Sequence, residues 1–68
     1  MVSKYNLGDV VEYEKDIYVI TDILLYNQYF IYSVKTVFYS QATKIQVRED
    51  LLKPVSEEQA NIVRVLYG

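Results

Sequence analysis

Residues 28–38 read Gln-Tyr-Phe-Ile-Tyr-Ser-Val-Lys-Thr-Val-Phe, and this run of aromatic and β-branched residues decides the fold class. Such residues favour the pleated, half-buried surface of a β-strand. Because successive side chains of a strand point to opposite faces, residues 30, 32, 34, 36 and 38 share one face. The other face mixes Tyr29 and Ile31 with Ser33 and Lys35, so we expect this strand to be contacted on both sides.

Further strands are predicted on either side of this one from β-branched content and flanking polar residues. The first covers residues 10–14, after Gly8-Asp9, and a two-residue turn at Lys15-Asp16 leads to the second, over residues 17–24. Residues 26–28 form the next turn, and residues 39–43 form a polar loop. Residues 44–49 alternate strictly between polar and apolar side chains, and a single helical turn is expected at residues 50–53, before Pro54.

The C-terminal residues predict a helix over about residues 56–67. Ser56 is the expected N-cap, and Gln59 three residues later completes a capping box. Apolar residues then recur at helical spacing: Ala60, Ile62, Val63, Leu66 and Tyr67. A helix of about three turns does not persist alone in water. We therefore expect it to dock on the sheet, with the seam of a homodimer as the alternative.

The length of 68 residues predicts a single domain over residues 1–68, with a small core. The chain has no cysteine, so its core depends on Val, Ile, Leu and Tyr, and self-association could add to it. The N-terminus lacks the apolar segment of a secretion signal, and residues 23–26, the longest apolar run, are too few to span a membrane. We expect a cytoplasmic protein that does not bind membranes.

The order of these elements resembles the SH3-like small β-barrel superfamily in its KOW- and Tudor-like forms. The motifs that carry the resemblance are Gly8-Asp9-Val10-Val11, Tyr18-x-Ile20-x-x-Ile23, Tyr32-x-Val34 and Val47-x-Glu49 before Leu52-Lys53-Pro54. It covers about residues 7–54 and implies a five-stranded barrel shut by a short 3-10 turn. The C-terminal helix is an addition to that barrel, and the glycine that KOW domains carry after the first strand is missing.

The chain lacks the side chains that most often carry catalysis or bind metals, since it contains no His and no Cys. Glu12 and Glu14 share a strand face and could bracket a cation, but a solvated face explains them better. Two glycines leave no phosphate-binding loop. We therefore predict a protein that is not an enzyme and that has no cofactor and no metal site.

Eight tyrosines indicate that surfaces carry the function, because Tyr fills a core with its ring or serves as a rigid anchor for a partner. The tyrosines assigned to the core or its edge are Tyr13, Tyr18 and Tyr32. The candidate partner-binding tyrosines are Tyr26, Tyr29 and Tyr39, near the ends of the long strand. Packing of these three against the C-terminal helix is the alternative.

Carboxylates are concentrated in the N-terminal third of a chain whose net charge is −2. They are Asp9, Glu12, Glu14, Asp16 and Asp22. Such acidity could present a negative face to a basic groove and so mimic DNA, although Lys15 dilutes it.

The size, acidity and composition are also similar to those of small proteins from phages of low-GC Gram-positive bacteria, many of which bind one host protein. The leading hypothesis is a non-enzymatic protein-binding module, a phage-encoded inhibitor or adaptor. Its host partner would be a nucleoid protein, RNA polymerase or a chaperone–protease component. The alternatives are a structural subunit of a larger assembly and a nucleic-acid-binding barrel that uses Lys35, Lys44 and Arg48 beside Tyr29 and Tyr39.

Overall fold

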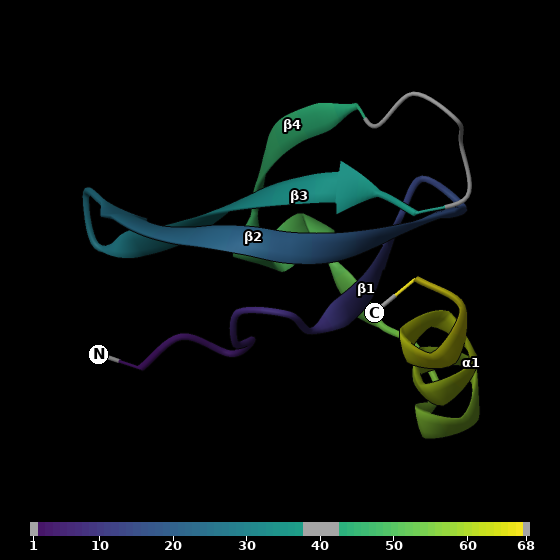
Figure 1. Cartoon of the computed structure of the whole chain (residues 1–68). Coiled ribbons are helices and arrows are strands. Elements are labelled where there is room, and N and C mark those ends of the chain that lie inside the picture. The colour runs from purple at the N-terminus through teal and green to yellow at the C-terminus, as the bar shows by residue number, and fades with distance from the viewer. Residues whose placement is uncertain (1, 38–42, 68) are drawn as a thin grey trace.

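The computed structural model describes residues 2–37 and 43–67 and shows a mainly β protein with one helix (Figure 1). The strands are β1 (Val10–Tyr13), β2 (Asp16–Tyr26), β3 (Tyr29–Thr36), β4 (Lys44–Arg48) and β5 (Lys53–Pro54). A 3-10 helix, η1 (Glu49–Leu51), separates β4 from β5, and α1 (Glu57–Tyr67) follows. The predicted five strands, short 3-10 turn and C-terminal helix are confirmed.

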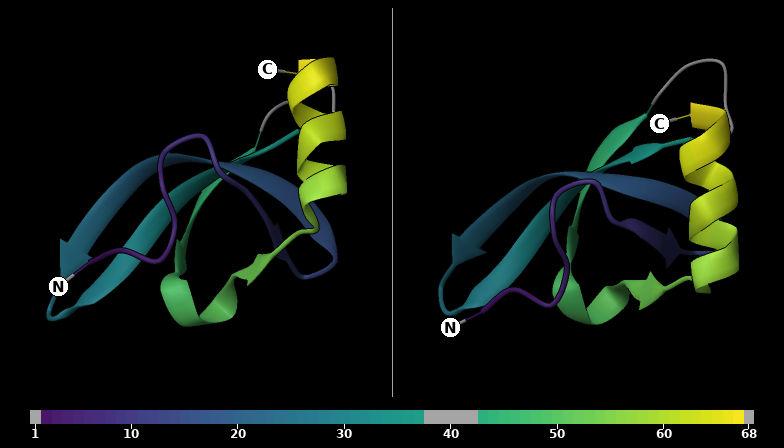
Figure 2. Two further views of the ribbon diagram at one scale, coloured as in Figure 1. Left: turned by 90° about the horizontal axis from the view of Figure 1, so that it is seen from below. Right: turned by 60° about the horizontal axis from the view of Figure 1, so that its bottom comes forward.

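All five strands belong to one antiparallel sheet in the order β4-β3-β2-β1-β5. Among the described residues no pairing joins β4 to β5, so the strand pairing ends at these two edges. Figure 2 shows the long β2–β3 hairpin extending away from the rest of the sheet. The closed barrel and the SH3-like superfamily therefore stay predictions.

The first hairpin turns at Glu14 and Lys15, whose φ angles are 49° and 69°. The predicted turn at Lys15-Asp16 is wrong by one residue, because Asp16 pairs with Tyr13 as the first residue of β2. Two positive φ angles in a two-residue loop match the right-handed twist of the strands, although neither residue type favours them. The position of this turn is set by the pairing of β1 with β2. That pairing places Val11 opposite Tyr18, and both side chains lie in the main core.

The second hairpin turns at Asn27 and Gln28, with φ angles of 47° and 71°. Because this loop uses only two residues, β2 continues to Tyr26 and β3 begins at Tyr29. The predicted boundaries, residue 24 for the end of β2 and residue 28 for the start of β3, are corrected accordingly. The predicted end of the long strand at residue 38 lies outside the described residues.

The main core lies on the inner face of the sheet. Its buried residues are Tyr5, Val11, Tyr18, Ile20, Tyr32, Val34, Val47 and Leu52. The core roles of Tyr18 and Tyr32 are confirmed, and Tyr13 packs against the edge of this cluster. Tyr5, for which the sequence predicts no role, is also buried, and its ring meets that of Tyr32 edge-on at a centroid distance of 5.6 Å.

A second, smaller core lies on the opposite face of β1 and β2, where α1 docks. It consists of Val10, Ile17, Ala60 and Val63. Ser56 caps the helix, because its Oγ accepts a hydrogen bond from the Gln59 N–H at 3.1 Å, as the predicted capping box requires. The docking of the helix is thus confirmed, while Ile62, Val65 and Leu66 stay exposed on its outer side.

A β-bulge at Thr21 changes the faces of β2 halfway along the strand. Ile20 pairs with Val34, but Asp22 pairs with the next residue, Ser33, so that Thr21 is the extra residue. Without it, the alternation that places Ile20 in the core would direct Asp22 inward. The bulge instead turns Asp22 outward and packs the partly buried Ile23 against the core.

No helix in the described part of the chain is both long and apolar enough to cross a membrane.

Two valines of α1 give a matched test of helix docking, because Val63 is 2% exposed and Val65 is 85% exposed. We expect Val63→Ala to lower the free energy of unfolding by about 1.5–3 kcal/mol, through lost apolar burial and a residual cavity. Val65→Ala should change it by no more than about 0.5 kcal/mol, since it removes no buried contact and Ala favours helix. Urea unfolding of both variants measures the difference; equal effects would contradict a helix docked through Val63.

Candidate protein-binding surface

Large apolar side chains are exposed at the far end of the β2–β3 hairpin. Leu24 is 42% exposed, Leu25 60%, Tyr26 58% and Tyr29 37%. Figure 1 shows this hairpin end on the opposite side of the molecule from α1. Packing of Tyr26 and Tyr29 against the helix, the alternative raised from the sequence, is therefore not what the structure shows. The third candidate, Tyr39, lies outside the described residues.

The exposure follows from the lengths of the neighbouring strands. β1 pairs with β2 no further than Val19, and the pairing of β4 with β3 ends at Ile31, opposite Arg48. The hairpin residues beyond these positions have no third strand beside them in the described ranges. Leu25, Tyr26 and Tyr29 consequently stay exposed, whereas Phe30 packs against the edge of the main core.

Aromatic contacts order this end of the hairpin. The rings of Tyr26 and Tyr29, the pair that closes the turn, meet edge-on at a centroid distance of 6.2 Å. The Arg48 guanidinium lies over the Tyr29 ring, 4.7 Å from its centroid, and Arg48 Nε also pairs with Asp50 Oδ1 at 3.3 Å. Such stacking is favourable and holds a long side chain in place. We call Leu24, Leu25, Tyr26, Tyr29 and Arg48 the tip surface.

The sequence pointed to the two tyrosines of the tip surface but not to its other members. Leu24 and Leu25 are adjacent, so they lie on opposite faces of β2, and only a strand that is bare on both faces exposes both. The sequence signal for this is the apolar pair Leu24-Leu25, which only Tyr26 separates from the turn residues Asn27-Gln28. Arg48 reaches Tyr29 only through the pairing of β4 with β3.

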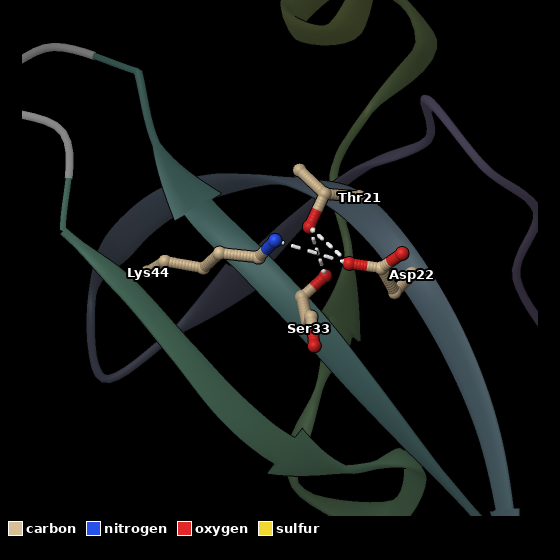
Figure 3. Close-up of polar contacts among 4 residues, drawn as sticks. All are labelled: Thr21, Asp22, Ser33 and Lys44. Carbon is tan, nitrogen blue, oxygen red and sulfur yellow. Dashed lines mark hydrogen bonds and ion pairs between the residues drawn. The ribbon is translucent and has the colours of Figure 1, made fainter.

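Polar side chains occupy the outer face of the sheet beside the tip surface. Lys44 Nζ forms an ion pair with Asp22 Oδ2 at 3.1 Å, and the Thr21 hydroxyl donates to the Ser33 carbonyl oxygen at 3.2 Å (Figure 3). Asp22, Ser33 and Lys44 also line a shallow hollow of about 540 Å³. Acidic groups pair with Lys44 and Arg48 on this face, whereas Lys35, opposite Lys44, is exposed and forms no ion pair with the described residues.

The five carboxylates predicted as partner residues lie in three different places. They are Asp9, Glu12, Glu14, Asp16 and Asp22. Asp9 closes a turn in the N-terminal segment, since its Oδ2 accepts a hydrogen bond from the Asn6 N–H at 2.8 Å. Glu12, Glu14 and Asp16 lie in or beside the β1–β2 turn. Asp22 pairs with Lys44 on the outer face of the sheet. The structure therefore does not gather the acidic stretch into one patch.

Tyr32 and Glu49 form a hydrogen-bonded pair in which the pKa of each group is shifted. The Tyr32 hydroxyl donates to Glu49 Oε2 at 2.6 Å, and the Lys4 N–H donates to the same oxygen at 2.9 Å. Burial, and then the hydrogen bond to Glu49, raise the pKa of Tyr32. The hydrogen bonds from Tyr32 and then from the Lys4 amide lower the pKa of Glu49.

This Tyr32–Glu49 pair joins three parts of the chain: the N-terminal segment, β3 and η1. The Tyr32 hydroxyl also accepts a hydrogen bond from the Tyr5 N–H at 3.1 Å, so the hydroxyl both donates and accepts. Because both groups are engaged within the chain, the shifted pKa values have a structural explanation. No group of three or more Asp or Glu side chains in the described ranges could hold a metal ion.

Comparisons with protein-family models, with curated proteins and with solved structures yield no match.

The Tyr32–Glu49 pair predicts how stability depends on pH. The folded pKa of Glu49 lies below its ordinary value of 4.5, so the unfolded chain takes up this proton first as the pH falls. Ionised Glu49 therefore stabilises the folded state fully above about pH 4.5, and this stabilisation is lost as the pH falls through the folded pKa of Glu49. We expect Glu49→Gln to flatten the decline of the unfolding free energy between about pH 5 and about pH 3.

Urea unfolding at a series of pH values measures this slope. Glu14→Gln, in the exposed β1–β2 turn, is the matched control and should retain the slope of the unmodified chain. Equal slopes for Glu49→Gln and the unmodified chain would show that the hydrogen bonds to Glu49 do not stabilise the folded state in this way.

Proposed function

We propose that this chain is a non-enzymatic protein-binding module that contacts its partner through the tip surface. The observation that carries the proposal is the exposure of Leu24, Leu25, Tyr26 and Tyr29 on a hairpin that projects beyond its neighbouring strands. Large apolar patches on small proteins mark interaction sites, and Tyr and Arg are the residues that most often dominate binding energy. Tyr26 and Tyr29 are already ordered by their mutual contact, and Arg48 by stacking, which reduces the entropy lost on binding.

The shape of the tip surface indicates the kind of surface that it fits. A narrow ribbon with apolar side chains on both faces suits a groove or cleft in the partner rather than a flat surface. Arg48 at its margin favours a groove with a carboxylate or carbonyl at the rim. In the phage setting that the composition suggests, the partner is a host protein in the cytoplasm, and the chain acts as its inhibitor or adaptor.

The arrangement of charges supports this proposal over direct binding of nucleic acid. Such binding relies on Lys and Arg that neutralise phosphates. Lys44 and Arg48 are already paired with Asp22 and Asp50, and the net charge of the chain is −2. DNA mimicry is also less well supported, because the five candidate carboxylates do not form one face.

Paired variants test the tip surface. The whole chain, tagged and immobilised, is used to capture a partner from host lysate, and the affinity for the captured protein is then measured. Tyr26→Ala and Tyr29→Ala should each weaken binding about tenfold, since each truncates a large exposed side chain at the predicted contact.

Ile62→Ala and Leu66→Ala on the outer side of α1 are the controls, because each also truncates a large apolar side chain that is more than half exposed. They should bind like the unmodified chain. Loss of binding in the helix variants with unchanged binding in the tyrosine variants would place the interface elsewhere and refute the proposal.

A titration separates the nucleic-acid alternative from protein binding. Fluorescence polarisation with short labelled single-stranded DNA and RNA, at low and moderate salt, should show no saturable binding, since Lys44 and Arg48 are paired with carboxylates and Lys35 alone is left to contact phosphates. Binding that weakens steeply with salt would support the nucleic-acid function instead.

A further inference from the structure

We infer that the open edge of β2, residues 22–26, pairs with the same edge of a second copy of the chain and forms a two-fold symmetric dimer. The edge includes Leu24, Leu25 and Tyr26 of the tip surface, but the inference does not require the proposed partner. Dimerisation is measured on the isolated chain, so its failure is distinguishable from a failure of partner binding.

The edge begins beyond Ile20, where β1 has ended and the N-terminal segment leaves the strand to contact Tyr32 and Glu49. Ile20 still exchanges backbone hydrogen bonds on this side, accepting from Gly8 N at 2.9 Å and donating to Asp9 O at 3.0 Å. Beyond the bulge, residues 22–26 pair with β3 alone among the described residues. Figure 2 shows β2 as the outer border of the hairpin on the side away from β4.

The antiparallel pattern identifies the backbone groups that this edge offers. Tyr26 and Tyr29 close a two-residue hairpin and therefore form a hydrogen-bonded pair, and such pairs alternate along an antiparallel ladder. Ile23 and Leu25 consequently direct their N–H and C=O groups away from β3. Unpaired groups of this kind are a template for another strand.

This edge carries fewer of the features that protect edges from pairing than β4 and β5 do, since Asp22 is the one charged residue among residues 22–26. Edge strands are commonly protected by charged residues and proline. β4 carries Lys44 and Arg48, and β5 consists of Lys53 and Pro54. Residues 23–26 include neither a charged residue nor a proline.

The edge is also complementary to itself. With Leu24 on the two-fold axis, Ile23 of each copy lies opposite Leu25 of the other, so the outward N–H and C=O groups of both residues find partners. Asp22 then lies opposite Tyr26 of the other copy, and no like charges meet. The two Leu24 side chains face each other across the axis on the same side of the joined sheet.

Dimerisation widens the two-stranded ribbon to four strands, so the dimer and the insertion of a single tip into a groove are alternative uses of this hairpin. Strand pairing uses backbone groups, so Tyr26 and Tyr29 of both copies remain exposed on one continuous sheet. Pairing of the two edges also covers part of the Leu25 side chain, which is 60% exposed in the single chain. A small chain without cysteines thereby gains buried apolar area by self-association.

A charge-swap experiment tests this register. Sedimentation equilibrium of the unmodified chain up to about 100 µM should show a dimer, and Leu24→Lys and Leu24→Glu should each weaken dimerisation at least about tenfold, because like charges then face each other. A 1:1 mixture of the two variants should recover dimers about tenfold tighter than either variant alone, since only residue 24 lies opposite itself. Far-UV circular dichroism and urea unfolding confirm that the variants fold.

If the Leu24 variants do not fold, Leu25→Pro probes the same edge, since it removes one outward N–H and no hydrogen bond to β3; it should also dissociate the dimer. Leu66→Lys on the exposed side of α1 is the control and should leave the dimer intact. The inference is overturned by an unmodified chain that stays monomeric, by a mixture that stays monomeric, or by a dimer that only Leu66→Lys dissociates.

Discussion

The burial of Tyr32 is the constraint on which the rest of the structure depends. Its ring is 0% exposed at the centre of the main core, so its hydroxyl cannot remain in bulk water. A buried hydroxyl without a partner costs about 1–3 kcal/mol, a large share of the stability of a chain this small. Glu49 and the backbone N–H of Tyr5 supply the partners, and in doing so they bring η1 and the N-terminal segment onto the end of the sheet. The hydrogen bonds of the Tyr32 hydroxyl thus hold together segments that are far apart in the sequence.

A second determinant is the bulge at Thr21, which separates the part of β2 that builds the core from the part that projects. Before it, Tyr18 and Ile20 face the core and β1 lies alongside. After it, the strand continues with β3 as its only neighbour among the described residues. Because bulges bend and twist a strand, the hairpin leaves the body of the sheet at this point. The leucines and tyrosines of the tip surface and the open edge of β2 all lie in the part of the hairpin that extends beyond the bulge.

Much of the fold could be predicted because its signals are local. The alternation of Phe30, Tyr32 and Val34 identifies the inner face of β3 directly, and Ser56 with Gln59 marks the start of the helix within four residues. The turn at Glu14 and Lys15 could not be placed, since long-range register overrides the preferences of those residues. The bulge left a signal: the core-facing residues Tyr18, Ile20 and Ile23 break the two-residue period of a strand by one residue.

The candidate site was harder to predict from the sequence than the fold, for a physical reason. Whether Tyr26 and Tyr29 are exposed depends on where β1 and β4 end, which their own neighbours in the sequence do not encode. The same applies to Tyr5, which is buried only because the N-terminal segment is held against Tyr32. A chain of 68 residues buries only part of its apolar surface within a single copy, and the tip, the outer side of α1 and the free edge of β2 carry much of the surface that stays exposed. Of these three, only the edge of β2 also leaves backbone groups unpaired, and strand pairing satisfies hydrogen bonds and covers apolar area at once. That combination makes the edge a more specific interface than an exposed helix stripe, which offers apolar contact alone.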